Sequence, residues 1–375
     1  MLLFHSRRVV VLAAVLAAAM AAAQIPGAPG LAKATPLEIV LVEAPVVRPA
    51  TVLQWKKERF QAVAVVLNER TDKAAYREVA RHISDGGLDL YWWIEVARNP
   101  KLATVHPRWM AALGSHEDWQ KNFPKFPEPG IGEVAKAFPW VPIGYAEAFD
   151  AHLKRIEQLL RRAPTRWRGL LLNDLQAGPS SCGCGNLQCR WAIDYNVPPT
   201  ATRLEGDDVA ARFVAEVRNR VGDKTVIPVW TTECAEVDLP PGKHQGRPGT
   251  GLCGTVGCAT GACPDVFTRQ WSALASGHDG PIGLLALHTA LQRTQQEFGG
   301  GPGWMTNVIA YLRETLPANG GKVISGQRLW LVVEGFRPNE EATARQLAAQ
   351  AGVGAVIVAR AGIDQTYEPR MLRTK

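Results

Sequence analysis

Carboxylate side chains recur where apolar stretches of the sequence end. The acidic residues at or directly after such ends are Glu43, Glu69, Glu95, Asp174, Glu233 and Glu334. His288 closes a further stretch in the same way. Carboxylates gathered at one place repel one another, so they need cationic partners, a bound cation or a catalytic use. The pattern therefore points to acid–base chemistry or, alternatively, to ion-paired structural residues.

Eight apolar stretches position these residues and predict buried strands. They cover residues 37–43, 61–68, 89–96, 168–174, 224–232, 281–288, 328–334 and 354–360. Each is nearly continuous in apolar residues, which is typical of parallel strands covered on both faces. Segments with helical spacing, such as Tyr76, Val79 and Ile83, lie between them. Eight alternating units predict an α/β fold of the (β/α)8 barrel (TIM barrel) class. The alternative for 37–43 is an extension outside the barrel.

Three connections are longer than simple loops and indicate where the site lies. They span about 97–145, 175–206 and 234–262, and they follow predicted strands 3, 4 and 5. In TIM barrels, loops at the C-terminal ends of the strands build the active site. No G-x-G-x-x-G motif directly follows any of the eight stretches, and no P-loop or G-x-S-x-G motif is found in the sequence, so a nucleotide enzyme or a serine hydrolase has no support.

The ends of strands 4 and 7 carry a family resemblance. Asn173-Asp174 ends strand 4 and Glu334 ends strand 7. In this the chain resembles (β/α)8 glycoside hydrolases, whose general acid follows strand 4 and whose nucleophile ends strand 7. Those enzymes have Asn-Glu where this chain has Asn-Asp, which is one methylene shorter. The segments WWIEVARNP, LLLNDLQAGPSSCGCGNLQC and PVWTTEC are also similar to those of uncharacterised secreted glycosidase-like barrel proteins.

The resemblance implies roles for individual residues in a retaining glycosidase. Hydrolysis needs one carboxyl that donates a proton and a second that stabilises or captures the oxocarbenium-like centre. The resemblance implies that Asp174 is the acid/base and Glu334 the nucleophile. Glu233 is the substitute for either, and Asn173 is expected to hydrogen-bond a sugar hydroxyl.

Aromatic and polar residues near the predicted mouth are candidates for substrate binding. They are Glu95, Trp93, Trp140, Trp230 and His288. Flat indole rings can stack on sugar rings, although such residues also fill barrel cores. Trp92 and Trp93 must face opposite sides of their strand, since adjacent strand residues alternate.

All seven cysteines fall in or beside two of the long connections. They are Cys182, Cys184, Cys189, Cys234, Cys253, Cys258 and Cys263. In an exported protein this pattern favours disulfides, and the odd number leaves one thiol unpaired. The alternative is a zinc or iron–sulfur site, although the spacings match no standard zinc motif. Either arrangement would hold the loops that shape the cleft.

The N-terminal sequence predicts export. Arg7 and Arg8 precede an apolar run over 9–19, and small residues at 21–23 fit a cleavage site. We therefore expect a signal peptide at 1–23, a flexible segment at 24–36 and one barrel domain at 37–375, in a secreted or periplasmic protein. No further segment is long and apolar enough for a membrane span. The net charge of +7 is spread out, so nucleic acid is not an expected partner.

The sequence therefore predicts an extracytoplasmic glycoside hydrolase that acts on an oligo- or polysaccharide without a cofactor. One alternative is a barrel that binds carbohydrate without hydrolysing it. The other is a metal-binding protein, with zinc or an iron–sulfur cluster at the cysteine-rich loops. The sequence does not determine the sugar, its linkage or the oligomeric state.

Overall fold

The computed structural model describes residues 35–113, 125–127, 129–175, 204–231, 263–286, 309, 312–313, 316–318, 320–334, 338–361 and 368–373. Within these ranges, the side chains at 112–113, 231, 263–268, 286, 316, 334 and 338–340 are not described. The predicted signal peptide, 1–23, and most of the segment 24–36 lie outside the described residues.

Eight parallel strands close into a barrel, which confirms the predicted fold class. The strands are β1 (Leu37–Val42), β2 (Ala62–Val66), β3 (Asp89–Glu95), β6 (Gly169–Asn173), β7 (Thr225–Thr231), β8 (Ile282–Ala286), β9 (Leu329–Glu334) and β10 (Ala355–Ala359). Their order around the barrel is β1-β10-β9-β8-β7-β6-β3-β2. Each lies within one of the eight predicted stretches. β1 pairs with both β2 and β10, so 37–43 belongs to the barrel wall.

Successive side chains of each strand point to opposite faces of the barrel wall, and this divides the core into two layers. Ile39, Leu41 and Trp93 belong to the cluster inside the barrel. Val40 and Trp92 belong to the cluster between the strands and the surrounding helices. Both faces of every strand are therefore covered, which explains why the strands are nearly continuous apolar stretches. Trp92 and Trp93 face opposite sides, as the alternation predicts.

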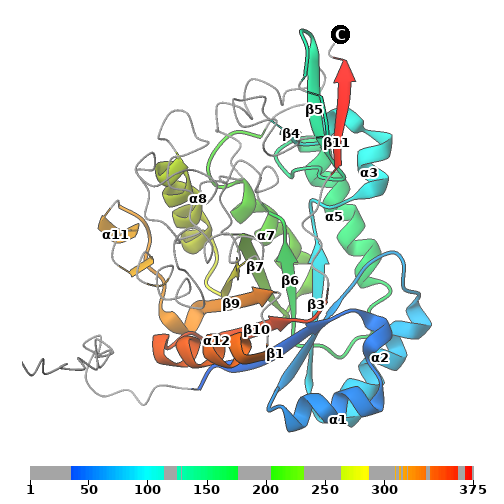
Figure 1. Cartoon of the computed structure of the whole chain (residues 1–375), viewed down its shortest axis with the longest axis vertical. Helices are drawn as coiled ribbons and strands as arrows, with labels where there is room; N and C mark the ends of the chain where they lie inside the picture. The colour runs from blue at the N-terminus through cyan, green and yellow to red at the C-terminus, as the bar shows by residue number, and fades with distance from the viewer. Residues whose placement is uncertain are drawn as a thin grey trace, which may run out of the picture. The chain divides into compact units, whose positions relative to one another are not determined.

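Helices follow the strands and cover the outside of the barrel (Figure 1). The longer ones are α1 (Pro49–Lys57), α2 (Lys73–Asp85), α5 (Ala146–Leu160), α7 (Val209–Val221), α8 (Cys263–Gly277) and α12 (Pro338–Ala351). On α2 the buried residues are Tyr76, Val79 and Ile83, the predicted apolar stripe. The short helices α3 (Pro100–Val105) and α11 (Leu316–Ala318) and the 3-10 turns η1 (Ala44–Val46), η2 (Pro107–Trp109) and η6 (Gly326–Arg328) complete the described helical elements.

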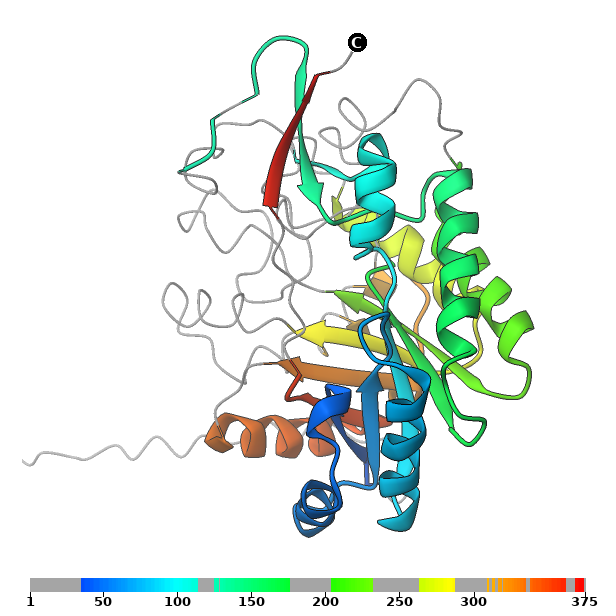
Figure 2. The same ribbon diagram turned by 90° about the vertical axis from the view of Figure 1, so that its right-hand side faces the viewer.

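A small antiparallel sheet stands beyond the end of β3 and was not predicted. It contains β4 (Ala112–Leu113), β5 (Glu133–Phe138) and β11 (Glu368–Arg373), in the order β11-β5-β4. Val141 donates its main-chain N–H to the Ala97 carbonyl oxygen at 2.8 Å, which ties the sheet to the chain leaving β3. Figure 2 shows the β5–β11 pair beside α3 and past the tips of the barrel strands. The long connection after strand 3 thus contributes two strands, β4 and β5, to a folded sheet.

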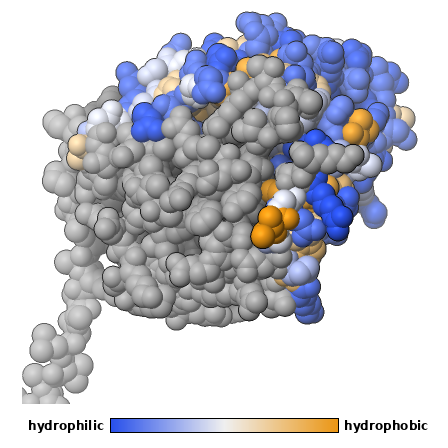
Figure 3. Space-filling view, turned by 90° about the horizontal axis from the view of Figure 1, so that it is seen from above, coloured by the Kyte–Doolittle hydropathy of each residue, from blue (hydrophilic) through white to orange (hydrophobic). Residues whose placement is uncertain are grey.

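The described residues on one face of the molecule are largely polar. On the face seen in Figure 3, the coloured residues are mostly hydrophilic, with isolated hydrophobic ones. In the part of the chain that the structure describes, no helix has the length and apolar character that a membrane crossing requires.

An ion-pair network lies where the first and last barrel strands meet. Arg345 on α12 lies 3.0 Å from Glu38 and 2.9 Å from Glu341, measured between guanidinium nitrogen and carboxylate oxygen. Its guanidinium also lies over the Phe60 ring, 4.2 Å from the centroid. The three charged side chains are only 16–22 % exposed, so solvent screens the network incompletely.

Replacing Arg345 by Met is expected to lower the free energy of unfolding by about 1–3 kcal/mol, because two half-buried carboxylates lose a partner. Urea denaturation measures the change. The control is Arg373→Met, because Arg373 is 89 % exposed and lies 3.7 Å from Glu133. The control should stay within about 0.5 kcal/mol of the parent protein. Equal losses in both variants would contradict a stabilising role for this network.

Candidate active site

Polar residues continue the inward-facing rows of three barrel strands. Glu95 follows Tyr91 and Trp93 in the interior row of β3, and Asn173 follows Leu171 in that of β6. Glu95 and Asn173 are register partners. Glu43 comes directly after β1 and continues its interior row. These residues therefore meet at the C-terminal mouth of the barrel, as the sequence predicts.

Both carboxylate oxygens of Glu95 are held by side-chain donors. The Trp93 indole N–H donates to Oε1 at 2.7 Å, and the Asn173 amide donates to Oε2 at 2.9 Å. Trp93 and Asn173 are fully buried, so packing fixes both donors. Arg155 on α5 donates to the main-chain oxygen of Glu95 at 2.7 Å. The position and orientation of this carboxylate are therefore set before any ligand binds.

Glu43 is a second carboxyl group at the mouth, in a different electrostatic setting. Burial raises the pKa of Glu43 above its ordinary value, the cation of Arg70 opposes this rise, and the charge of Glu95 adds to it. The Arg70 guanidinium lies 4.0 Å from the Glu43 carboxylate and is 83 % exposed, so solvent weakens its effect. Glu43 and Glu95 thus interact electrostatically, and Glu43 retains its proton to a higher pH than a free carboxyl group does.

Asp174 is fully buried and forms an ion pair. Its Oδ2 lies 3.5 Å from the Nε of Arg98, whose side chain is 10 % exposed. Its Oδ1 accepts a hydrogen bond of 3.2 Å from the Asn173 amide. The backbone of Asp174 has a φ of 63°, in the left-handed region that Asp tolerates better than most residues. Asp174 is thus placed as the charge partner of Arg98, beside the residue that holds Glu95.

Glu69 at the mouth is also an ion-pair partner. The Arg155 guanidinium donates to its two carboxylate oxygens at 2.6 and 3.2 Å. Burial alone would raise the pKa of Glu69, but the hydrogen bond and the charge of Arg155 outweigh it and lower the pKa. Since the same guanidinium holds the main chain of Glu95, this pair supports the end of β3.

The three tryptophans expected to contact a substrate are packed in the interior. Trp93, Trp140 and Trp230 are 0, 2 and 4 % exposed. Trp140 packs against alanines of the small sheet, and Trp230 packs in the layer beneath the helices. Trp93 reaches the site through its indole N–H. In this structure their rings serve packing, and none presents an open face to a sugar.

Several predicted site residues lie outside the described part of the structure. They are Glu233, His288, Cys182, Cys184, Cys189, Cys234, Cys253 and Cys258. Cys263 begins α8, and Glu334 ends β9 in register with Ala359, but neither side chain is described. Among the described residues, no three His, Cys, Asp or Glu side chains are grouped closely enough to hold a metal ion.

Arg98 and Arg155 are site residues that the sequence analysis missed. Each lies far along the chain from the carboxylate that it pairs with, so no local spacing marks it. The Trp93–Glu95 contact did have a signal, because residues two apart on a strand share a face. An acidic residue two positions after an inward-facing donor is a pattern that could have identified this pair.

Comparisons with known proteins assign no family. No protein-family model and no curated protein matches the sequence. Among solved structures, the β-galactosidase from the psychrophilic Marinomonas ef1 is similar, with 12 % identity and a TM-score of 0.45. That similarity covers 86 % of this chain and 54 % of the β-galactosidase, so the chain spans about half of its length.

Two further solved structures are similar over most of this chain. The catalytic domain of β-amylase from Paenibacillus polymyxa has 10 % identity and a TM-score of 0.46, over 90 % of this chain and 96 % of that one. Dihydropteroate synthase from Thermus thermophilus has 12 % identity and a TM-score of 0.34, over 88 % of this chain and 90 % of that one. None of these similarities assigns a reaction to this chain.

Proposed function

We propose that the chain is a glycoside hydrolase that acts on an oligo- or polysaccharide at the C-terminal mouth of its barrel. The observation that carries the proposal is the electrostatic contrast between two carboxyl groups there. Glu95 is clamped by two donors, and Glu43 is a neighbouring carboxyl with a raised pKa. Acid-catalysed cleavage of an acetal needs a proton donor and a fixed carboxylate at one place.

In this proposal Glu43 donates a proton to the oxygen of the leaving sugar. Glu95 faces the anomeric carbon, where it captures the oxocarbenium-like centre or activates a water molecule. The separation of the two carboxyl groups decides which: about 5–5.5 Å fits capture with retention, and about 6.5–9.5 Å fits a water molecule and inversion. No cofactor takes part, because both steps use only protons and a carboxylate.

We assign the proton-donor role to Glu43 rather than to Asp174. A general acid must hold its proton near the working pH. Burial and the charge of Glu95 favour this for Glu43, whereas the Asp174 carboxylate forms an ion pair with the guanidinium of Arg98 at 3.5 Å. That Glu334 or Glu233 acts as a nucleophile stays a prediction, because neither side chain belongs to the described part of the structure.

Asn173 is proposed to contact the substrate as well as Glu95. Its amide nitrogen donates to Glu95 and Asp174, whereas its Oδ1 has no hydrogen-bond partner among the described residues. A sugar hydroxyl would satisfy that acceptor.

Export to the periplasm or the medium remains part of the proposal and rests on residues 1–23. N-terminal sequencing of the mature protein, with cleavage expected after residue 23, tests it.

The pH dependence of hydrolysis tests the role of Glu43. Since the general acid must be protonated, the rate should fall as the pH rises through the pKa of Glu43. Arg70→Ala removes the cation that lowers this pKa, so the high-pH limb of the rate profile should move to higher pH. The measurement is kcat against pH on an aryl glycoside that the parent protein cleaves.

The matched control for Arg70→Ala is Arg212→Ala, an exposed arginine on α7 that pairs with Asp208. Its high-pH limb should coincide with that of the parent protein. If the high-pH limb of Arg70→Ala does not move, or moves to lower pH, then Glu43 is not the group whose deprotonation lowers the rate. Because salt screens the exposed Arg70 charge, the difference between the variants should shrink as the ionic strength rises.

A further inference from the structure

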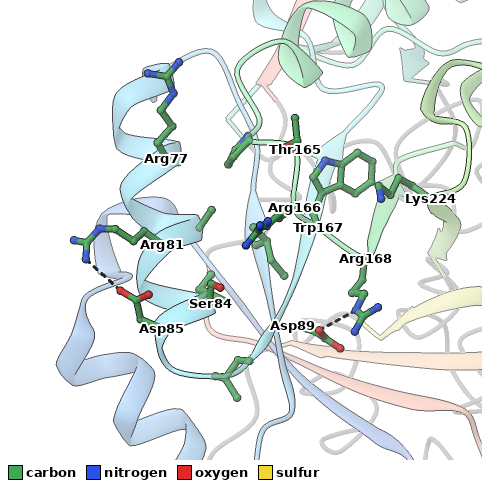
Figure 4. Close-up of a pocket in the computed structure, with 15 residues that line it drawn as sticks. Arg77, Arg81, Ser84, Asp85, Asp89, Thr165, Arg166, Trp167, Arg168 and Lys224 are labelled. Carbon is green, nitrogen blue, oxygen red and sulfur yellow. Dashed lines mark hydrogen bonds and ion pairs between the residues drawn. The ribbon is translucent and has the colours of Figure 1, made fainter.

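A surface groove lies at the other end of the barrel, away from the mouth. Its volume is about 660 Å³, and it lies where α2 leads into β3, where α5 leads into β6 and where α7 leads into β7. These are the N-terminal ends of the strands. Figure 4 shows arginines of α2 on one side of the groove and Trp167, Arg168 and Lys224 on the other, with Arg166 between them.

Positive side chains predominate in this groove. Its cationic lining residues are Arg77, Arg81, Arg166, Arg168 and Lys224, against two carboxylates, Asp85 and Asp89. Arg81 pairs with Asp85 at 3.2 Å and Arg168 pairs with Asp89 at 2.9 Å. In the described part of the chain, neither Arg77 nor Arg166 has an ion-pair partner. The groove thus holds two guanidinium groups that have no ion-pair partner among the described residues, together with two ion pairs.

The mixture of paired and unpaired charges in the groove favours one kind of anion. Duplex DNA carries about one negative charge per 1.7 Å and is bound by dense, continuous basic surfaces. Here Asp85 and Asp89 interrupt the positive charge, so a dense polyanion would meet repulsion. A chain with one carboxylate per sugar or per disaccharide places its charges farther apart. Such a ligand can place carboxylates on Arg77 and Arg166 while its neutral parts contact the rest of the groove.

Other lining groups suit the neutral part of a sugar chain. The hydroxyl-bearing side chains of Ser84 and Thr165 line the groove and are exposed. The indole of Trp167 is half-buried, with the Lys224 ammonium 5.8 Å from the centroid of a ring. Hydroxyls hydrogen-bond sugar hydroxyls, and guanidinium forks bind carboxylates with two parallel hydrogen bonds. The groove therefore offers guanidinium groups for the carboxylates of a uronic-acid polymer and hydroxyl groups for its sugar hydroxyls.

We propose that this groove is a binding site for an acidic polysaccharide that contains uronic acids. Arg77 and Arg166 bind its carboxylates, and the hydroxyls and Trp167 contact the sugar rings. The site is separate from the mouth of the barrel, so the inference does not depend on the proposed hydrolase activity. The role of this groove is to hold the protein on the polysaccharide.

The test measures binding of the full chain to polygalacturonate and to hyaluronate by isothermal titration calorimetry. Neutral dextran, a short DNA duplex and phosphatidylglycerol vesicles are titrated in parallel. Binding to the uronate polymers should weaken as the salt concentration rises. The variant Arg77→Ser/Arg166→Ser should weaken it at least about tenfold. Both arginines are exposed and have no ion-pair partner among the described residues, so the melting temperature should not change.

The control Lys57→Ser/Lys101→Ser removes the same number of exposed cations outside the groove. It should bind the uronate polymers as the parent protein does. The proposal is overturned if neither uronate polymer binds, if the arginine variant binds as tightly as the control, or if DNA or vesicles lose as much affinity as the uronates. Cleavage of a short neutral glycoside should be equal in all variants, which separates this site from the mouth.

Discussion

Replacing Glu95 by Gln should reduce glycoside hydrolysis by at least about a thousandfold, which corresponds to roughly 4 kcal/mol of lost transition-state stabilisation. The substitution keeps the size of the side chain and removes its charge. The Trp93 donor still finds an oxygen, but the glutamine cannot capture or stabilise an oxocarbenium-like centre. Initial rates of reducing-end release from a panel of oligo- and polysaccharides measure the effect.

Folding and sugar binding should survive in Glu95→Gln, because the substitution removes no buried apolar contact and only the hydrogen bond from the Asn173 amide is lost. The comparison variant is Glu147→Gln, an exposed carboxylate on α5, which should retain the parent rate. If Glu95→Gln hydrolyses at the parent rate, Glu95 does not take part in the chemistry. If the parent protein binds a sugar and releases no product from any substrate, the barrel binds carbohydrate without hydrolysing it.

Asp174→Asn should lower the free energy of unfolding by about 3–5 kcal/mol, because the largely buried cation of Arg98 loses its countercharge. Arg98 and Asp174 have side-chain exposures of 10 and 0 %, so solvent cannot replace the missing partner. Chemical denaturation at neutral pH measures the loss. The double variant Arg98→Met/Asp174→Asn should lose less than the sum of the single variants, since neither charge is then left alone.

An exposed ion pair provides the contrast for this prediction. Arg168 and Asp89 lie closer, at 2.9 Å, but are 67 and 47 % exposed. By distance alone, this pair would contribute more to the free energy of unfolding than Arg98–Asp174. Because Arg98–Asp174 is buried, we expect the opposite order. Arg168→Met should therefore cost less than about 1 kcal/mol. If Asp174→Asn is as stable as the parent protein but has lost hydrolysis, the acid role belongs to Asp174 after all.

The barrel could be predicted because its strands are covered on both faces. Each of the eight strands is a short, nearly continuous apolar stretch, and a closed parallel barrel is the fold that eight of these alternating with amphipathic helices favour. The same pattern placed Glu95 and Asn173 at strand ends, where register then brings them together. The residues at the end of a strand can thus be predicted from the sequence whenever the strand can be predicted.

The partners of the site carboxylates could not be predicted, because they come from distant segments. Arg155 belongs to α5 and reaches Glu69 and the main chain of Glu95. Arg98 follows β3 and reaches Asp174 after β6. These contacts reassign Asp174 from proton donor to ion-pair partner in our proposal. Only the folded arrangement shows that Asp174 lies in a buried ion pair, whereas the carboxylate of Glu95 is held by neutral donors.

The small sheet escaped prediction for a similar reason. β5 contains Lys136 within EVAKAF, and β11 is the charged segment EPRMLR at the far end of the chain. Neither is an apolar stretch, and each needs the other to satisfy its main-chain hydrogen bonds. Lys136 is buried and donates to the Met110 carbonyl oxygen at 2.9 Å, a contact that no local pattern indicates.

A crystal structure of Glu95→Gln with an uncleaved oligosaccharide tests the proposed active site most directly. We expect the glycosidic oxygen to lie within hydrogen-bond reach of the Glu43 carboxyl, at about 2.6–3.2 Å. We also expect residue 95 to face the anomeric carbon. A sugar whose scissile bond lies between Asp174 and Glu334, or outside the barrel mouth, would contradict it.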